Sequence, residues 1–338
     1  MPYKPHYPVK PGGLRAVETM NVNELDKDMH AFRETRRRLP LRTEALTQLG
    51  RGTFHADVNV FAAPEATLYL ARVNMRSTTL ADLHEDYTGL VFPLSWQREF
   101  VINGEEVNAR SIYGPVDGTL FQVYGDQRET VAVALPRKDF LATIAALGGV
   151  DVDGVQFDGG PIETAASLMA SARRSLSTMI REYARASRCN DVSPGAGEML
   201  SSDIVGILTD LYLQARPVPV PRVRVPARLG RIVRKAEDYF AEKQPGPVSL
   251  ADLCAVAGVS QRTLYHAFLV MCGDSPMAYF KKRRLTDARL ALLDPGPVRR
   301  LVKRAALNAG LTHFGRFSAE YRELFGESPT TTLEMSSG

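Results

Sequence analysis

The sequence predicts an α+β protein in two parts: an N-terminal β-barrel followed by long helices, and an all-α C-terminal region. Three observations support this fold class. Short segments rich in β-branched and aromatic residues alternate with turn residues between positions 54 and 136. Apolar residues recur at helical spacing through the C-terminal third of the chain. A proline-rich segment separates the two parts.

Length and composition fit two ordinary globular domains. The chain has 338 residues, of which 44% are hydrophobic and 24% charged. Three cysteines without a CxxC pair favour a reducing compartment, so we expect a cytoplasmic protein. No stretch approaches the roughly 18 apolar residues of a membrane span, and the N-terminus lacks the apolar run of a signal peptide. We therefore expect no membrane association.

The N-terminal part is predicted to be mostly strand. The expected strands are the segments FHADVNVF, TLYLARVNM, FVINGEEVNA, LFQVYG and TVAVALP, all between residues 54 and 136. Within the third segment, Asn103-Gly104 is a strong signal for a type I′ hairpin turn. Short strands with turns between them are typical of a sandwich or a small barrel.

Three helices are expected after these strands. One begins near Arg137, and two longer amphipathic helices cover residues 162–187 and 197–215. Their apolar faces would bury against the barrel or against a second subunit, so we predict a homodimer. Residues 1–215 thus form one domain. Residues 216–228 form a linker that begins with four prolines in eleven residues, and residues 229–334 form the second domain.

Charge is distributed unevenly between the two parts. Residues 217–338 carry 19 Lys and Arg against 11 Asp and Glu, a net charge of +8, whereas the rest of the chain has −4. A basic C-terminal third indicates an anionic partner such as DNA.

The C-terminal third contains two segments with one shared plan. The first runs from Leu250 to Phe268 and the second from Val302 to Tyr321. Each has a helix of small residues, a glycine at a turn, an apolar residue, a Ser/Thr cap and a second helix. Ser249 is the expected N-cap of the first segment. Glycine suits a turn with positive φ, so the pattern predicts two helix-turn-helix units.

These residues resemble the AraC/XylS family of transcription regulators over positions 229–334. The most specific match is GRFSAEYRELFGESP, which ends at Pro329, and CGDSPMAYFKKRRLTDARLALL resembles the family's connection between its two units. Leu311 and Ala305 depart from the family pattern, where larger apolar residues are usual. The resemblance implies two recognition helices in successive major grooves of double-stranded DNA, and contact with RNA polymerase if the protein is an activator. It also implies a cupin-like β-barrel sensor with dimerising helices in the N-terminal domain.

Recognition-helix positions give candidate DNA contacts. The candidates for base contacts are Gln261, Arg262, Tyr265 and His266 in the first unit, and Thr312, His313 and Arg316 in the second. Arg262 and Arg316 rank first, because Arg pairs bidentately with guanine. The candidates for phosphate contacts are Lys281, Lys282, Arg283, Arg299 and Arg300. The alternative is that these residues form the solvated face of a protein–protein module.

Motifs for catalysis are missing from the sequence. A metal-binding cupin enzyme needs closely spaced His ligands with a carboxylate, and only His84 with Glu85 and Asp86 comes near this pattern. Nucleophile elbows, phosphate loops and GxGxxG do not occur. We therefore predict no catalytic residues, no metal and no cofactor. Two alternatives stay open: a barrel enzyme fused to a DNA-binding domain, and a DNA-binding protein that ignores ligands.

A cluster of arginines precedes the first expected strand. Arg33, Arg36, Arg37, Arg38 and Arg42 have only Glu34 nearby to neutralise them. Without these five arginines, residues 1–216 would carry −9 rather than −4. The bland interpretation is a solvated helix end or a patch that contacts the second domain. The functional interpretation is a site for an anionic ligand.

A second basic element supports the functional interpretation. Two-residue alternation in TLYLARVNMR places Leu68, Leu70, Arg72, Asn74 and Arg76 on one strand face. A barrel exterior does not need such a row, and a barrel interior could not bury it unpaired. An anionic ligand lying against the strand would supply the partner.

The two elements together resemble the cyclic di-GMP site of PilZ domains. Arg33-Glu-Thr-Arg36-Arg37 satisfies that family's RxxxR motif, and Asn74 with a displaced Ser77 partly matches its (D/N)xSxxG motif. The resemblance implies cyclic di-GMP as the effector, with a different small-molecule effector as the alternative. The predicted effector-binding residues are Arg33, Arg36, Arg37, Arg38, Arg72, Asn74 and Arg76.

Overall fold

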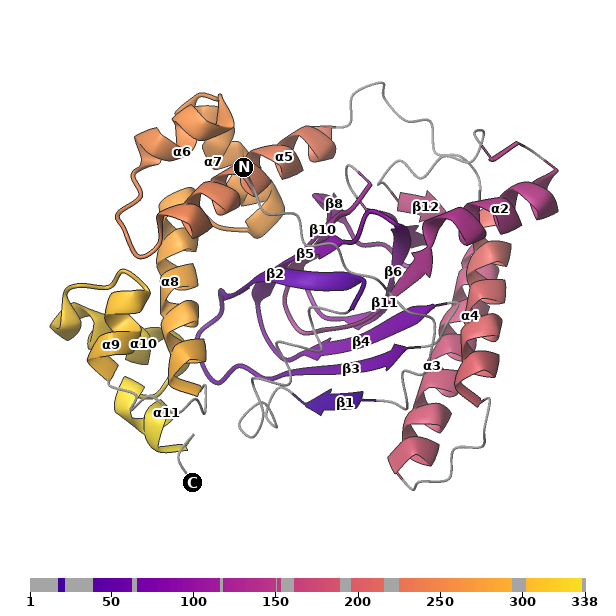
Figure 1. The fold of residues 1–338 in the computed structure, drawn as a ribbon, viewed down its shortest axis with the longest axis horizontal. Helices are drawn as coiled ribbons and strands as arrows, with labels where there is room; N and C mark the ends of the chain where they lie inside the picture. Colours follow the sequence, from indigo (N-terminus) through magenta and orange to yellow (C-terminus); the bar gives the residue numbers. More distant parts are fainter. Residues whose placement is uncertain are drawn as a thin grey trace.

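The computed structural model describes residues 18–21, 39–62, 66–115, 118–149, 151–152, 161–188, 196–215, 225–293 and 302–335. A sheet-rich N-terminal region lies between two groups of helices (Figure 1). Helices α2 to α4 flank one side of the sheets, and helices α5 to α11 flank the opposite side. The predicted α+β class, with a helical C-terminal region, is confirmed.

The described strands form two antiparallel sheets. The seven-stranded sheet has the order β1-β3-β4-β11-β6-β9-β12. Its strands are β1 (Glu18–Asn21), β3 (Ala56–Ala62), β4 (Thr67–Val73), β6 (Tyr87–Trp96), β9 (Ser111–Tyr113), β11 (Arg128–Pro136) and β12 (Pro161–Glu163). The five-stranded sheet has the order β2-β5-β10-β7-β8. Its strands are β2 (Leu41–Gln48), β5 (Ser77–Leu83), β7 (Phe100–Ile102), β8 (Glu105–Glu106) and β10 (Leu120–Gly125).

The hairpin turn predicted between β7 and β8 is confirmed. Asn103 and Gly104 both have positive φ, 56° and 80°, as a type I′ turn requires. Asn103 is also buried, because its side chain bonds to the Gln122 amide and the Gly114 carbonyl. The turn therefore also ties β7 to its neighbours.

Apolar side chains fill the space between the sheets and the space outside the larger sheet. Between the sheets, Val91 and Tyr113 of the larger sheet pack against Phe100 and Phe121 of the smaller one. On the outer face of the larger sheet, the strand side chains pack against α2 (Arg137–Gly148), α3 (Ala166–Arg188) and α4 (Ala196–Leu213). The expected burial of these helices against the sheets is confirmed, since Leu176, Ile204 and Leu208 are fully buried there.

The C-terminal region contains helices throughout its described residues. They are α5 (Val225–Lys243), α6 (Leu250–Ala257), α7 (Gln261–Cys272), α8 (Pro276–Leu293), α9 (Val302–Asn308), α10 (Phe314–Phe325) and α11 (Pro329–Met335). Two separate cores hold them: one among α5 to α8, and one among α8 to α11. Helix α8 contributes to both cores and so joins the two helix-turn-helix units.

Several local predictions need correction. Strands β5 and β6 were not predicted from the sequence, although neither lies at the edge of its sheet. The segment expected to open a helix at Ile162 instead pairs with β9 as strand β12. Strand β4 ends at Val73, so the expected single face does not continue through Asn74 and Arg76, which lie in the turn before β5.

Two glycines provide a matched test of the helix-turn-helix fold. Gly258 ends α6 with φ 67°, and a Cβ placed there would meet no atom within 4 Å, so Gly258→Ala adds only backbone strain. We expect this change to cost about 1–2 kcal/mol of stability. Gly206 lies within α4, where Ala is the better helix former, and it also has open space. Gly206→Ala should stabilise the protein by up to about 1 kcal/mol.

Urea unfolding monitored by circular dichroism measures both changes. Equal effects of the two substitutions would contradict the assigned left-handed turn at Gly258.

Candidate nucleic-acid interface and effector site

The first helix-turn-helix unit is shaped by two capped helices. The Ser249 hydroxyl accepts a bond from the Asp252 amide at 3.2 Å, and the Asp252 carboxylate accepts one from the Ser249 amide at 2.9 Å. These two bonds complete the capping box. The Ser249 hydroxyl also donates to the Asp252 carboxylate at 2.7 Å, and this bond, together with the one from the Ser249 amide, lowers the pKa of Asp252. Ser260 caps α7 by accepting a bond from the Thr263 amide. The caps and the Gly258 turn fix the direction in which α7 leaves the unit.

Helix α7 turns its predicted recognition face to solvent. Gln261, Arg262, Tyr265 and His266 are exposed. The opposite face is buried in the core of the unit, where Leu264 and Phe268 are fully covered. The four predicted base-contact residues therefore share one accessible surface, as a recognition helix requires.

The second unit exposes the corresponding surface on α10. Thr312, His313 and Arg316 are exposed, whereas Phe317 and Tyr321 are buried. The predicted Ser/Thr cap is wrong for this helix, because its N-cap is His313 and makes no side-chain capping bond. Arg316 pairs with Glu320 at 2.7 Å, but its side chain stays 74% exposed and accessible to a DNA base.

The run of basic residues 281–284 near the middle of α8 does not form one phosphate-binding patch. Lys281 is exposed and pairs with Glu320 at 2.8 Å, across the two units. Lys282 instead donates to Asp274 at 2.8 Å and to the carbonyl of Leu49 at 3.1 Å, so the N-terminal domain engages it. The other two predicted phosphate contacts, Arg299 and Arg300, lie outside the described residues.

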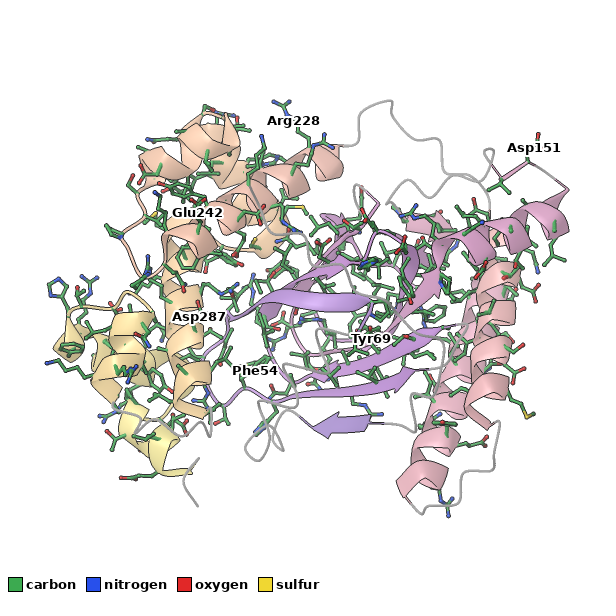
Figure 2. The ribbon with its side chains drawn as sticks, in the orientation of Figure 1. Phe54, Tyr69, Asp151, Arg228, Glu242 and Asp287 are labelled. Carbon is green, nitrogen blue, oxygen red and sulfur yellow. The ribbon has the colours of Figure 1, made fainter. Side chains whose placement is uncertain are left out.

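Arg283 does not fit the predicted role of phosphate contact. Its side chain is only 14% exposed, and it pairs with Glu237 at 3.5 Å and with Asp287 at 3.0 Å. Burial alone would lower the pKa of Arg283, but these two carboxylates raise it. Because this guanidinium pairs with the buried Glu237 and the partly buried Asp287 inside the first unit, it does not fit a DNA contact. Asp287, the second partner, lies one helical turn after Arg283 on α8 (Figure 2).

Only part of the predicted effector site lies within the described residues. Arg33, Arg36, Arg37 and Arg38 lie outside them. Arg72 is half exposed on β4 and pairs with Glu129 of β11 at 2.8 Å. Asn74 accepts a bond from the His55 amide at 2.8 Å and donates to the Thr53 carbonyl at 3.0 Å.

Arg76 joins a group of three side chains. Its guanidinium donates to Glu99 at 3.1 Å and to the Tyr124 hydroxyl, which itself donates to Glu99 at 2.5 Å. Burial and the Glu99 carboxylate raise the pKa of Tyr124 to about 12. The premise that the Arg-x-Asn-x-Arg row lacks partners is therefore wrong, because protein groups pair with all three residues. Arg72 and Arg76 stay 50% and 40% exposed, so an anion still has access to both.

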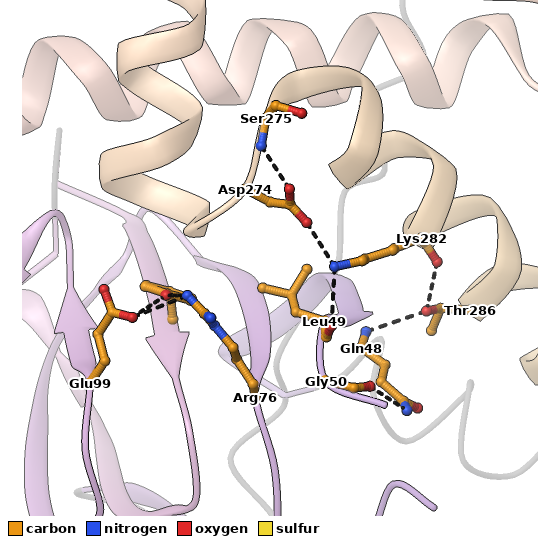
Figure 3. A network of polar contacts seen from close by, with 10 residues as sticks. Gln48, Leu49, Gly50, Arg76, Glu99, Asp274, Ser275, Lys282 and Thr286 are labelled. Carbon is orange, nitrogen blue, oxygen red and sulfur yellow. Dashed lines mark hydrogen bonds and ion pairs between the residues drawn. The ribbon is translucent and has the colours of Figure 1, made fainter. Parts of the chain in front are cut away.

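Sequence reasoning missed the contact between the two domains. Residues 48–52 of the N-terminal domain bond to α8 and to the end of α10, and Figure 3 shows this network around Lys282. Gln122 bonds to Cys272 at 2.9 Å, and Arg234 bonds to Asp82 at 3.1 Å. One signal was available: LFQVYG places Gln122 and Tyr124 on the same outward strand face, where both are buried.

The described residues contain neither a membrane-spanning helix nor a metal cluster. No helix among them is long and apolar enough to cross a membrane. No group of three or more His, Cys, Asp and Glu side chains within the described ranges is arranged to hold a metal ion. Cys272 is buried and Cys254 partly buried, with neither in a disulfide.

Comparison with known proteins identifies the C-terminal region as a helix-turn-helix domain. A family model described as a helix-turn-helix domain matches residues 253–335. The XylDLEGF operon transcriptional activator 2 of Pseudomonas putida is 36% identical over 97 residues, which are 29% of this chain and 62% of that protein. The probable thc operon regulatory protein of Rhodococcus erythropolis is 37% identical over 102 residues, which are 30% of this chain and 31% of that protein. The chain thus matches less than two thirds of each relative.

Two solved structures resemble the chain over most of its length. The AraC-like transcriptional activator CuxR has a TM-score of 0.39 and 11% identity, covering 81% of this chain and 95% of that one. ToxT from Vibrio cholerae has a TM-score of 0.32 and 13% identity, covering 88% of this chain and 99% of that one. At these TM-scores neither structure establishes a shared arrangement of the domains.

Arg262→Ala should change base preference at one position of the bound DNA. A bidentate pair with guanine contributes about 1–3 kcal/mol of discrimination, and Arg262 lies exposed on the first turn of α7. Selection of bound sites from a randomised DNA library, followed by affinity measurement, tests the prediction. The assignment of Arg262 as a base contact does not survive if the variant selects the same bases as the wild type.

Lys281→Ala should weaken binding to every DNA sequence by a similar factor. A phosphate contact carries no base information, and its loss should reduce the slope of log affinity against log salt by about 1. Affinities at four salt concentrations, for a selected site and for random DNA, give this slope. Arg262→Ala is the matched control. A changed base preference in Lys281→Ala would contradict the division between the two classes of contact.

Proposed function

Because the C-terminal third of this chain is an AraC/XylS-type helix-turn-helix region, we propose that the protein is a ligand-controlled transcription regulator. It binds double-stranded DNA through both units. The observation that carries the proposal is the pair of exposed recognition faces on α7 and α10, held by one framework. The regulatory names of the relatives support this class over a barrel enzyme fused to a DNA-binding domain.

The framework between the units is polar as well as helical. Arg284 of α8 donates to the Ala309 carbonyl of the second unit at 2.7 Å and to the Gly246 carbonyl before α6 at 2.6 Å. Its guanidinium also lies 4.9 Å from the centre of the Phe240 ring. With Lys281 bonded to Glu320, these contacts resist relative rotation of the units, which favours binding to two sites at one fixed spacing.

The N-terminal domain supplies control and assembly in this proposal. Helices α3 and α4 cover the larger sheet with one face, and their other faces would pair two copies into a homodimer. Doubling the DNA-binding regions raises affinity through effective concentration without a new type of contact. The Pseudomonas relatives are named as transcriptional activators. If this protein is also an activator, its dimer would contact RNA polymerase as well as DNA.

Cyclic di-GMP is the leading candidate for the effector. Arg33, Arg36, Arg37 and Arg38 precede the first strand of the smaller sheet, and Arg72, Asn74 and Arg76 supply the second element. Exposed guanidinium groups suit phosphates bidentately and stack on guanine planes. For the ligand to bind, Arg72 and Arg76 exchange their exposed ion pairs with Glu129 and Glu99, which costs little. Arg76 also gives up its bond to the Tyr124 hydroxyl.

A different anionic small molecule is the second candidate, and Arg128 favours it. This guanidinium is 4% exposed and lies between the sheets, where it bonds to the Gly125 and Asp126 carbonyls and the Ser77 hydroxyl. Burial lowers the pKa of Arg128 to about 10. Because apolar side chains fill the space between the sheets, a carboxylate or phosphate would have to replace one of these oxygens to pair with Arg128.

Calorimetric titration of cyclic di-GMP into the purified protein tests the leading candidate, with GTP and cyclic di-AMP as controls. We expect saturable, guanine-selective binding that is lost in Arg37→Ala while the thermal unfolding midpoint without ligand stays unchanged. No heat and no ligand-induced shift of the midpoint would reject cyclic di-GMP. DNA affinity that ignores every anion tried would favour a regulator without a ligand.

A further inference from the structure

Residues 48–52, which we name the bridging segment, contact both helix-turn-helix units at once. The Gln48 amide donates to the Thr286 hydroxyl of α8 at 3.3 Å, and the Leu49 carbonyl accepts from Lys282. At the other end, the Gly52 amide and the Gln48 side chain both donate to the Leu324 carbonyl of α10, at 2.9 and 3.1 Å. The segment therefore spans the gap between α8 and the end of the second recognition helix.

The bridging segment is also anchored by apolar and charged contacts. Leu49 is 6% exposed and packs into the core of the first unit, so the burial of its side chain favours the attached position of the segment. Arg51 pairs with Glu323 of α10. The Gln48 side chain donates to the carbonyls of Gly50 and Gly52 and so keeps the segment curved. The same five residues thus hold two units that have separate cores.

The turn that contains Asn74 and Arg76 bonds to the bridging segment and to the residues that follow it. The amides of Leu49 and Gly50 both donate to the Arg76 carbonyl, at 3.0 and 2.8 Å. Asn74 bonds to Thr53 and His55, directly after the segment. Contact is close, since a Cβ on Gly50 would lie 3.3 Å from the Cβ of Arg76. The position of this turn therefore sets the position of the segment.

The Arg76 side chain reaches the DNA-binding region by a second route. It bonds to Tyr124, whose ring is buried against the turn between α7 and α8. A Cβ on Gly273 of that turn would collide with the Tyr124 ring, so the two residues are in direct contact. Figure 3 shows Arg76 and Glu99 on one side of the bridging segment and Lys282 on the other.

We propose that the bridging segment is a brace that fixes the relative position of the two helix-turn-helix units, and that Arg76 is the positioning residue that sets this brace. The recognition faces of α7 and α10 are exposed with the brace in place, so it does not block DNA. It narrows the range of distances between the two base-reading faces. Lys282 belongs to the brace rather than to the phosphate contacts.

Hydrogen exchange on the ligand-free protein tests the brace directly. Arg76→Ala keeps the carbonyl that accepts from Leu49 and Gly50 but removes the side-chain bonds to Glu99 and Tyr124 that hold the turn. Exchange of the amides of residues 49–52 should therefore accelerate at least tenfold, and exchange around residues 273–282 should rise with it. Arg72→Ala is the matched control, because Arg72 precedes the same turn, is exposed and pairs with Glu129. Wild-type exchange in Arg76→Ala, or equal acceleration in Arg72→Ala, would overturn the proposal.

Substitutions of Lys282 distinguish a role in the brace from a role as a phosphate contact. As part of the brace, Lys282→Ala accelerates exchange at residues 49–52 and leaves the salt slope of DNA binding unchanged, and Lys282→Arg restores slow exchange. A salt slope reduced by about 1 with wild-type exchange would return Lys282 to the phosphate contacts and reject its role here.

DNA binding supplies an independent readout of the brace. A site selected by the wild type is lengthened or shortened by one base pair between the two base-reading contacts. The braced wild type should lose at least tenfold in affinity on either change, and Arg76→Ala should lose less than threefold. Equal losses in both proteins would show that α8 and Arg284 alone fix the spacing, and the brace would be rejected.

The brace also gives the proposed effector a route to the DNA-binding region, and this link rests on the proposed function. An anion that draws Arg76 away from Glu99 and Tyr124 would act as Arg76→Ala does. Adding cyclic di-GMP to the wild type should then accelerate exchange at residues 49–52. No acceleration, with the variant results intact, would reject the effector link and leave the brace standing.

Discussion

The arrangement of this chain depends on how the outer face of the smaller sheet is covered. Helices α2 to α4 cover the larger sheet, but no helix of the described N-terminal region covers the smaller one. The C-terminal helices do so instead, with Tyr124 packed against Gly273 and Leu49 inserted into the core of the first unit. The DNA-binding region is therefore part of the packing of the N-terminal domain. Any change at the sheet face acts on α7 and α8.

Four consecutive basic residues show why a cluster in sequence is not a patch in space. Each residue of an α-helix is rotated by about 100° from the one before it, so residues 281–284 point in four directions. Lys281 faces α10, Lys282 faces the sheet, Arg283 faces the buried Glu237, and Arg284 faces the carbonyls between the units. Of these four residues only Lys281 is exposed, so it is the one whose side chain can contact a phosphate.

Sequence patterns predicted the C-terminal region well because its information is local. Helix caps at Ser249 and Ser260, the positive φ of Gly258 and Gly310, and the helical spacing of apolar residues are all set within a few positions. The hairpin at Asn103-Gly104 was predicted for the same reason. Strands β5 and β6 were missed because both are almost wholly buried, so the polar–apolar alternation that marks a half-exposed strand is absent.

The candidate effector site shows the opposite case, in which sequence patterns do not contain the decisive information. The row of Arg72, Asn74 and Arg76 was correctly seen as charge that needs a partner, yet Glu129 lies 57 residues and Tyr124 lies 48 residues away from the arginines they bind. No period of two or of 3.6 reveals such pairs, because strand order alone brings them together.

The partners also change what the row can do. A row of side chains without protein partners could bind a ligand, but the binding would change no contact inside the protein. The Arg76 carbonyl accepts from the amides of residues 49 and 50, whereas its side chain bonds to Glu99 and Tyr124. An anion that takes the guanidinium would replace the side-chain bonds and leave the carbonyl bonds in place. Exposed ion pairs contribute about 0–1 kcal/mol, so a phosphate that binds bidentately has enough energy to exchange them. A switch needs both a ligand preference and an alternative internal contact, and Arg76 is the described residue of this row that bonds directly to the bridging segment and to Tyr124.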